Sequence, residues 1–262
     1  MWRSWLLIIA ALIQPGALVG EQVAVRHMEG TLHGFLVLRS LDGNTLAAGD
    51  LIQSGDRDRL VSNLVFHFKD GSVDDETTIF SQRRNFRLLS DHHVQKGPSF
   101  PHPIDISIDA SKNRVIVHST DGGKDKVETD HLDLPPDLAN GLVLTLLKNI
   151  RPDAAETKVS YLAFTPKPRL VTLLIKPEGE DRFWTAGARH RATPYDVKVE
   201  LGGLTGVLAP LVGKQPKDIH VWILGGDAPA FVRMEGQLYQ GGPLWRIELT
   251  NPVWQQSQHS GH

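Results

Sequence analysis

The sequence contains no cysteine, and this absence excludes several kinds of chemistry. The chain can form no disulfide, thiol nucleophile or thiolate metal site, and it cannot carry a lipid on an N-terminal cysteine. It also lacks a surplus of positive charge, because 28 Lys and Arg stand against 30 Asp and Glu. Proteins that bind nucleic acid regardless of sequence need a strong positive surplus. We therefore expect no nucleic-acid partner.

Long apolar runs are missing too, apart from a short one near the N-terminus. Arg3 precedes the uninterrupted apolar run Trp5–Ile13, which is about half the ~20 residues needed to span a bilayer. The run is broken at residues 14–16, and the polar Glu21 follows Gly20. This layout is typical of a secretory signal peptide. We predict a signal peptide over residues 1–20, export to the periplasm or beyond, and no transmembrane segment after cleavage; a buried N-terminal helix is the alternative.

No catalytic signature is present. The sequence has neither a G-x-S-x-G nucleophile elbow nor a G-x-G-x-x-G loop that opens a helix. We therefore predict no catalytic residue and no cofactor. The acidic stretch Asp74–Glu76 has oxygen ligands for calcium but lacks the ligand order of a dedicated calcium loop. We expect a solvated hairpin tip there.

What the sequence does have is the pattern of antiparallel strands. From Gln22 to His131, short apolar runs alternate with turn dipeptides about every 8–15 residues. The dipeptides begin at Asp42, Gly55, Asp70, Lys96, Lys112 and Asp121. Alternation within the runs predicts one dry and one wet face. In "NFRLLSDHHVQ", for example, it predicts a shared face for Phe86, Leu88, Ser90, His92 and Val94.

One segment near the middle of the chain breaks this pattern. In "LDLPPDLANGLVLTLLKNIRP", Asp133 is a candidate cap, two prolines follow, and leucines recur every fourth residue. This predicts a helix near 135–150, after which strands return. The fold class is therefore mainly β: a curved antiparallel sheet or barrel with one central helix. We predict one domain over 21–254, with two stacked β units (21–132 and 153–254) as the alternative, and a flexible tail over 255–262.

Three histidines lie close together in "SDHHVQKGPSFPHP": His92, His93 and His102. Zinc sites need at least three protein ligands, and Asp91 or Asp105 could complete such a set. Adjacent residues of a strand point to opposite faces, however, so His92 and His93 cannot both bind one metal from a regular strand. We favour a strand end and loop with solvated histidines, and we keep a metal-assisted hydrolase as the alternative function.

Aromatic residues recur within the strand-like runs. In a curved sheet, such rings either fill the interior or line a pocket for an apolar ligand. Plain core packing is the commoner use. Our candidates for ligand binding are Phe66, Phe68, Phe86, Trp184, Tyr195, Trp222 and Trp245.

The C-terminal third resembles a known kind of protein. The stretch Gly187–Leu249 contains a strand with Trp222 and a "G-x-A-P-x-F-V" turn before the next strand. It resembles the end of secreted bacterial β-rich proteins of unknown function, distantly similar to periplasmic lipoprotein carriers. Those carriers have a curved antiparallel sheet around an apolar cavity, and several helices where this chain has one. The resemblance implies an exported protein that binds an apolar or amphipathic, lipid-like molecule. The other alternative is an envelope scaffold that binds another protein through an exposed sheet edge.

Overall fold

The computed structural model describes residues 20–121, 124–164, 168–185, 188–200 and 216–250. The predicted signal peptide, apart from Gly20, and the predicted tail lie outside these ranges. The described residues form a sheet of fifteen strands and one short helix, α1 (Val143–Leu147). The strands of the first half are β1 (Leu32–Ser40), β2 (Thr45–Gly55), β3 (Arg59–Phe68), β4 (Val73–Gln82), β5 (Phe86–Lys96), β6 (Ile104–Asp109), β7 (Arg114–Asp121) and β8 (Lys124–His131). Those of the second half are β9 (Thr157–Ala163), β10 (Arg169–Pro177), β11 (Asp181–Thr185), β12 (Ala188–Glu200), β13 (Ile219–Leu224), β14 (Ala230–Gly236) and β15 (Trp245–Thr250).

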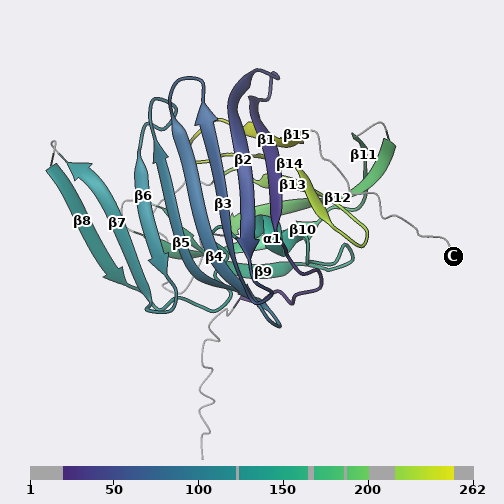
Figure 1. Cartoon of the computed structure of the whole chain (residues 1–262), viewed down its shortest axis with the longest axis horizontal. Coiled ribbons are helices and arrows are strands. Elements are labelled where there is room, and N and C mark those ends of the chain that lie inside the picture. Colours follow the sequence, from purple (N-terminus) through teal and green to yellow (C-terminus); the bar gives the residue numbers. More distant parts are fainter. Residues whose placement is uncertain (1–19, 122–123, 165–167, 186–187, 201–215, 251–262) are drawn as a thin grey trace, which may run out of the picture.

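All the strands belong to one continuous antiparallel sheet. Their order is β8-β7-β6-β5-β4-β3-β2-β1-β15-β14-β13-β12-β10-β9, and β11 pairs with β12. The two halves of the chain join where β1 pairs with β15, for example at Leu38 and Ile247. The sheet folds over on itself, so that β1–β5 face β9–β15 with α1 between them, while β7 and β8 extend to one side (Figure 1). The predicted fold class is confirmed, and the structure shows a curved sheet that stays open rather than a closed barrel.

The turn dipeptides mark the ends of the strands as predicted. Hairpins join β1 to β2 at Asp42–Gly43 and β3 to β4 at Asp70–Gly71. At the second hairpin, Gly71 has φ 84°, and its N–H donates to the carbonyl of Phe68. Backbone of this conformation favours glycine, which explains the dipeptide. Gly122 of the last predicted turn lies outside the described residues.

The helix is much shorter than predicted, because part of the predicted segment has another role. Leu138 forms a parallel bridge with Ser160, and the N–H of Ala139 donates to the Ser160 carbonyl at 2.8 Å. Asn140 acts as a surrogate backbone: its Oδ1 accepts from the Leu162 N–H at 2.8 Å, and its Nδ2 donates to the Leu162 carbonyl at 3.0 Å. The residues before α1 therefore cover the edge of β9 instead of forming helical turns.

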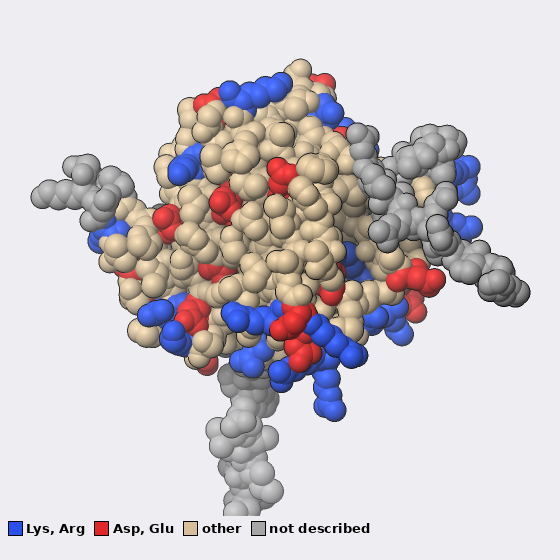
Figure 2. All heavy atoms as spheres, viewed as in Figure 1, with Lys and Arg blue, Asp and Glu red and all other residues tan. Residues whose placement is uncertain are grey.

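The hydrophobic core lies between the two layers. Leu142, Leu146, Leu147 and Ile150, at and around α1, are buried in one cluster with side chains from both layers. In the described part of the chain, no helix has the length and apolar character to cross a membrane. The outer face of β1–β6 is largely uncharged, with scattered acidic side chains and most Lys and Arg near its rim (Figure 2).

Candidate functional site

A polar cluster lies inside the folded sheet, on the faces of β4 and β5 that otherwise point into the core. On β4, the buried Asp74 and Thr78 lie on the same side of the strand as the fully buried Phe80, and the residues between them are half-buried. On β5, the register shifts opposite Ile79 and Phe80, whose partners are Ser90 and Leu88, so Leu89 is an extra residue. Such a bulge reverses which residues of a strand face the core.

Because of the bulge, the inner face predicted for β5 is right up to Leu88 and wrong beyond it. Phe86 and Leu88 point inward as expected, but beyond the bulge the buried residues are Asp91 and Gln95, each at most 2% exposed. His92 therefore points outward and His93 inward. The residues predicted to share the inner face as Ser90, His92 and Val94 are on the other side.

We call Asp74, Glu76, Asp91 and His93 the inner cluster. His93 Nε2 lies 2.6 Å from Asp74 Oδ1, and its Nδ1 lies 3.9 Å from Glu76 Oε1. The Thr78 hydroxyl donates to Asp91 Oδ1 at 2.8 Å, while Asp91 Oδ2 is buried without a hydrogen-bond partner. The predicted solvated hairpin tip at residues 74–76 is thus wrong for Asp74 and Glu76, which face the interior.

Burial and mutual repulsion change the protonation of this cluster. Burial, and to a smaller extent the nearby Glu76 carboxylate, raise the pKa of Asp91 from 3.8 to about 8. Burial likewise raises the pKa of Glu76. Burial alone would lower the pKa of His93. The surrounding Glu76, Asp74 and Asp91 carboxylates have the larger combined effect and raise this pKa to about 9. At neutral pH the cluster therefore holds a protonated Asp91 and a His93 cation paired with Asp74.

The inner cluster is covered by parts of the chain that are distant in sequence. His93 contacts the edge of the Phe164 ring, with 5.5 Å between centroids, and Phe164 in turn contacts Tyr161 of β9. Burial and the inner-cluster carboxylates raise the pKa of Tyr161. On another side, Gly141 lies so near that a Cβ there would be 1.9 Å from Thr78 Oγ1. The cluster thus joins β4 and β5 to the opposite layer.

The three histidines proposed for a metal do not converge. His92 lies on the outer face, where its Nε2 is 3.0 Å from Asp105 Oδ1, and about half of its side chain is exposed. His93 lies inside, and His102 is exposed in the loop after β5. Within the described ranges, no three His, Asp or Glu side chains are arranged to hold a metal ion. The alternative of one metal site formed by His92, His93 and His102 therefore has no geometric support among the described residues.

Most of the aromatic candidates are buried in the hydrophobic core. The buried rings are those of Phe66, Phe68, Phe86, Tyr195 and Trp245. Phe68 contacts Trp245 with 5.5 Å between ring centroids, and Tyr195 donates its hydroxyl to the Ile150 carbonyl at 2.8 Å. Burial raises the pKa of Tyr195 to about 12. The side chain of Trp184, on β11, lies outside the described part.

Trp222 lies apart from the other rings. It packs with Phe183 against a small cluster of Ala192, Leu224 and Val232. Its Nε1 donates to Asp181 Oδ2 at 3.1 Å, and the Arg233 guanidinium lies 5.4 Å from the centroid of its ring. This small cluster adjoins a groove, because Leu224 also lines the groove described next.

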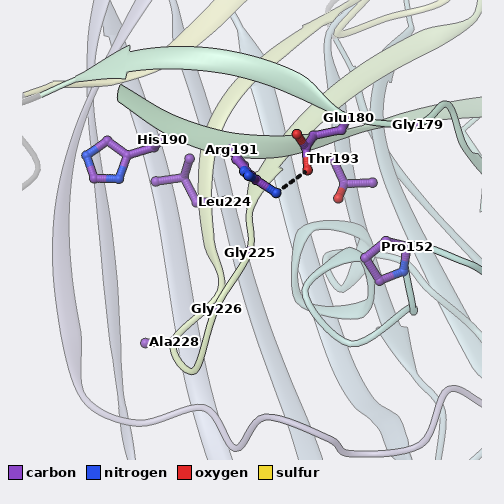
Figure 3. A pocket seen from close by; sticks show the side chains of 10 residues that line it. All are labelled: Pro152, Gly179, Glu180, His190, Arg191, Thr193, Leu224, Gly225, Gly226 and Ala228. Carbon is purple, nitrogen blue, oxygen red and sulfur yellow. Dashed lines mark hydrogen bonds and ion pairs between the residues drawn. The ribbon is translucent and has the colours of Figure 1, made fainter. Parts of the chain in front are cut away.

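The groove has a volume of about 560 Å³ and lies where the β10–β11 loop, β12 and the β13–β14 turn meet the loop after α1 (Figure 3). Its apolar surface comes from Pro152, Leu224 and Ala228. Its polar side chains include Arg191 and Glu180, which pair at 3.4 Å. The other lining residues are Gly179, His190, Thr193, Gly225 and Gly226.

Neither the inner cluster nor the groove is predicted from the sequence. Alternation in "VDDETTIFSQ" was a usable signal for the first, because Asp74, Glu76 and Thr78 share the parity of the core residue Phe80. No comparable signal exists for the groove, whose residues come from four separate segments of the chain.

Comparison with solved structures shows a similarity of fold. No protein-family model matches the chain, and no curated protein matches it. Among solved structures, it is similar to a β-barrel-like protein of domain of unknown function DUF1849 from Brucella abortus. The sequences are 9% identical, the similarity covers 86% of this chain and 98% of that chain, and the TM-score is 0.47.

Proposed function

We propose that this chain is an exported binding protein that holds an apolar or amphipathic, lipid-like molecule in the groove of Figure 3. The observation that carries the proposal is the composition of the groove. Apolar Pro152, Leu224 and Ala228 lie beside the charged pair of Arg191 and Glu180 within one space of about 560 Å³. Small-molecule sites typically have volumes of about 300–1,000 Å³, an apolar lining and a few polar groups that fix orientation.

The glycines of the groove favour the same use. Gly225 and Gly226 are exposed, and a Cβ built at either would meet nothing within 4 Å. The wall is therefore backbone at these points, which leaves room for a ligand chain. An apolar tail would lie against Leu224 and Pro152, and a polar head group would contact Arg191 or Glu180.

The groove is a more accessible place for the ligand than the buried rings. Phe66, Phe68, Phe86, Tyr195 and Trp245 form part of the core, so a ligand could contact them only by displacing other side chains. Trp222 packs against Leu224 and is the aromatic candidate that adjoins the groove. The signal-peptide pattern at residues 1–20 supports export.

Filling the groove should weaken binding of an apolar probe. Ala228 is exposed on the β13–β14 turn, so Ala228→Trp should place an indole in the groove without disturbing the core. We expect the variant to bind the fluorescent probe N-phenyl-1-naphthylamine at least about tenfold more weakly than the wild type, equivalent to ~1.4 kcal/mol. Fluorescence titration of both proteins measures this.

The matched control is Leu41→Trp, which adds an indole to the exposed hairpin after β1, where Leu41 is 44% exposed and does not line the groove. It should bind the probe as the wild type does. Native mass spectrometry of protein purified from its own host should in addition show a co-purifying lipid. Equal probe binding by Ala228→Trp and the wild type would contradict the proposed site, and a host-purified protein without any bound molecule would contradict the proposed ligand class.

A further inference from the structure

The two edges of the open sheet differ in whether another segment of the chain covers them. At the β9 end, the Ala139 N–H and the Asn140 side chain occupy backbone groups of the edge strand. At the β8 end, the sheet order gives β8 no neighbour beyond β7 among the described residues. An uncovered edge presents a row of N–H and C=O groups that can pair with another strand.

Of the features that usually prevent such pairing, β8 has charged side chains but neither a proline nor a bulge. Its sequence, KDKVETDH, contains no proline or glycine. Its pairing with β7 continues without a bulge from Arg114↔His131 to Asp121↔Lys124. At its middle, Val127 is 58% exposed, one of the most exposed large apolar side chains of the described residues. The charges on β8 therefore determine which strands can pair with it.

Those charges match a second copy of the same strand. When two β8 strands are aligned antiparallel about Val127, Lys126 of each copy stands opposite Glu128 of the other. The same register places the backbone position of Lys124 opposite that of Asp130. Within one chain, Lys126 and Glu128 already pair on the same face, and their side chains are 59% and 45% exposed. Opposite charges across an antiparallel pair are stabilising, and a parallel, in-register copy would place like charges together.

We propose that two copies of this chain associate through β8, in antiparallel register about Val127, to form one sheet that continues from one copy into the other. The interface is isologous, as expected of a two-fold dimer. A pair of strands buries less surface than the ~1,200 Å² at the low end of specific interfaces, so the dimer should be weak and depend on concentration.

Charge exchange at the paired positions tests the proposal. In the wild-type chain, sedimentation velocity from about 1 to about 100 µM should show a dimer fraction that rises with concentration. Glu128→Lys places a lysine of one copy opposite a lysine of the other on both sides of Val127. The variant should therefore sediment as a monomer over the whole concentration range. The double variant Lys126→Glu/Glu128→Lys restores opposite charges and should recover the dimer. Both variants change exposed side chains, and circular dichroism checks that the fold is kept.

Three outcomes would overturn the proposal. One is a wild-type chain that is monomeric at every concentration. The second is a dimer that Glu128→Lys leaves unchanged, which would locate the interface elsewhere. The third is a double variant that stays monomeric while folded, because pairing about Val127 requires the exchange to restore the dimer.

Discussion

Replacing Asp91 by asparagine should make the protein more stable at pH 8 and remove much of its loss of stability between acid and alkaline pH. The pKa of Asp91 is raised from 3.8 to about 8 by burial, so the folded state keeps a proton that the unfolded state releases. The free energy of unfolding therefore falls as the pH rises from about 4 to about 8, by an amount on the order of 2–5 kcal/mol. Asparagine resembles the protonated acid and does not titrate, so its benefit should grow over this interval.

His93 should extend the decline to higher pH. Its pKa is raised from 6.5 to about 9 by the carboxylates around it, so its contribution is complete below about 6.5 and is lost as the pH rises through 9. The two groups thus act in the same direction. In the Asp91→Asn variant, the remaining loss of stability should come from Glu76, whose pKa burial also raises, and, between about pH 6.5 and 9, from His93, which the unfolded chain deprotonates and the folded chain does not.

Urea unfolding at a series of pH values from about 4.5 to about 9 measures these slopes. The control is Asp109→Asn. Hydrogen bonds from Ser111 and the nearby Lys112 lower the pKa of Asp109, so this variant should lose stability at neutral pH and approach the wild type in acid. A wild-type stability that increases steadily from pH 5 to pH 8, with Asp91→Asn destabilised by the same amount throughout, would contradict the assignment of a buried proton to Asp91.

The inner cluster also illustrates how far sequence reasoning reached. Two-residue periodicity predicted the strands and turn dipeptides predicted the hairpins, because both signals depend only on neighbours along the chain. It failed within β5, where one extra residue at Leu89 reverses the inner and outer positions. The stretch "RLLSDHH" contains no signal for this bulge. His92 was therefore predicted on the inner face of the sheet, although it lies on the outer face. A single unpredicted residue was thus enough to hide Asp91 and His93 as an interior pair.

The length of the helix and the presence of the groove could not be predicted for a different reason. Both depend on contacts between segments that are distant in the sequence. Leucines at fourfold spacing predicted a helix near 135–150, but Ala139 and Asn140 instead form hydrogen bonds with the edge of β9. Tertiary contacts often override local helix preference in this way. The groove likewise exists only because the loop holding Pro152 lies beside the turn that contains Ala228.

Gly141→Ala should cause a large loss of stability through the same tertiary contacts. Gly141 has φ 65°, a conformation that favours glycine, and an added Cβ would lie 1.9 Å from Thr78 Oγ1 and 2.8 Å from Asp91 Oδ1. Thr78 cannot easily move, because it is 2% exposed and donates its hydrogen bond to Asp91. We expect a loss of at least about 3 kcal/mol in the free energy of unfolding, from backbone strain and overpacking together.

Gly179→Ala separates these two causes. Gly179 also has a positive φ, 87°, but a Cβ built on it meets nothing within 4 Å, so alanine there should cost only about 1 kcal/mol of backbone strain. A double-mutant cycle with Thr78→Ala then isolates the contact with the inner cluster, because removing Oγ1 should relieve part of the Gly141→Ala penalty. If urea unfolding gave Gly141→Ala and Gly179→Ala equal losses, with no coupling to Thr78, the segment before α1 could not lie against β4 and β5 as the structure places it.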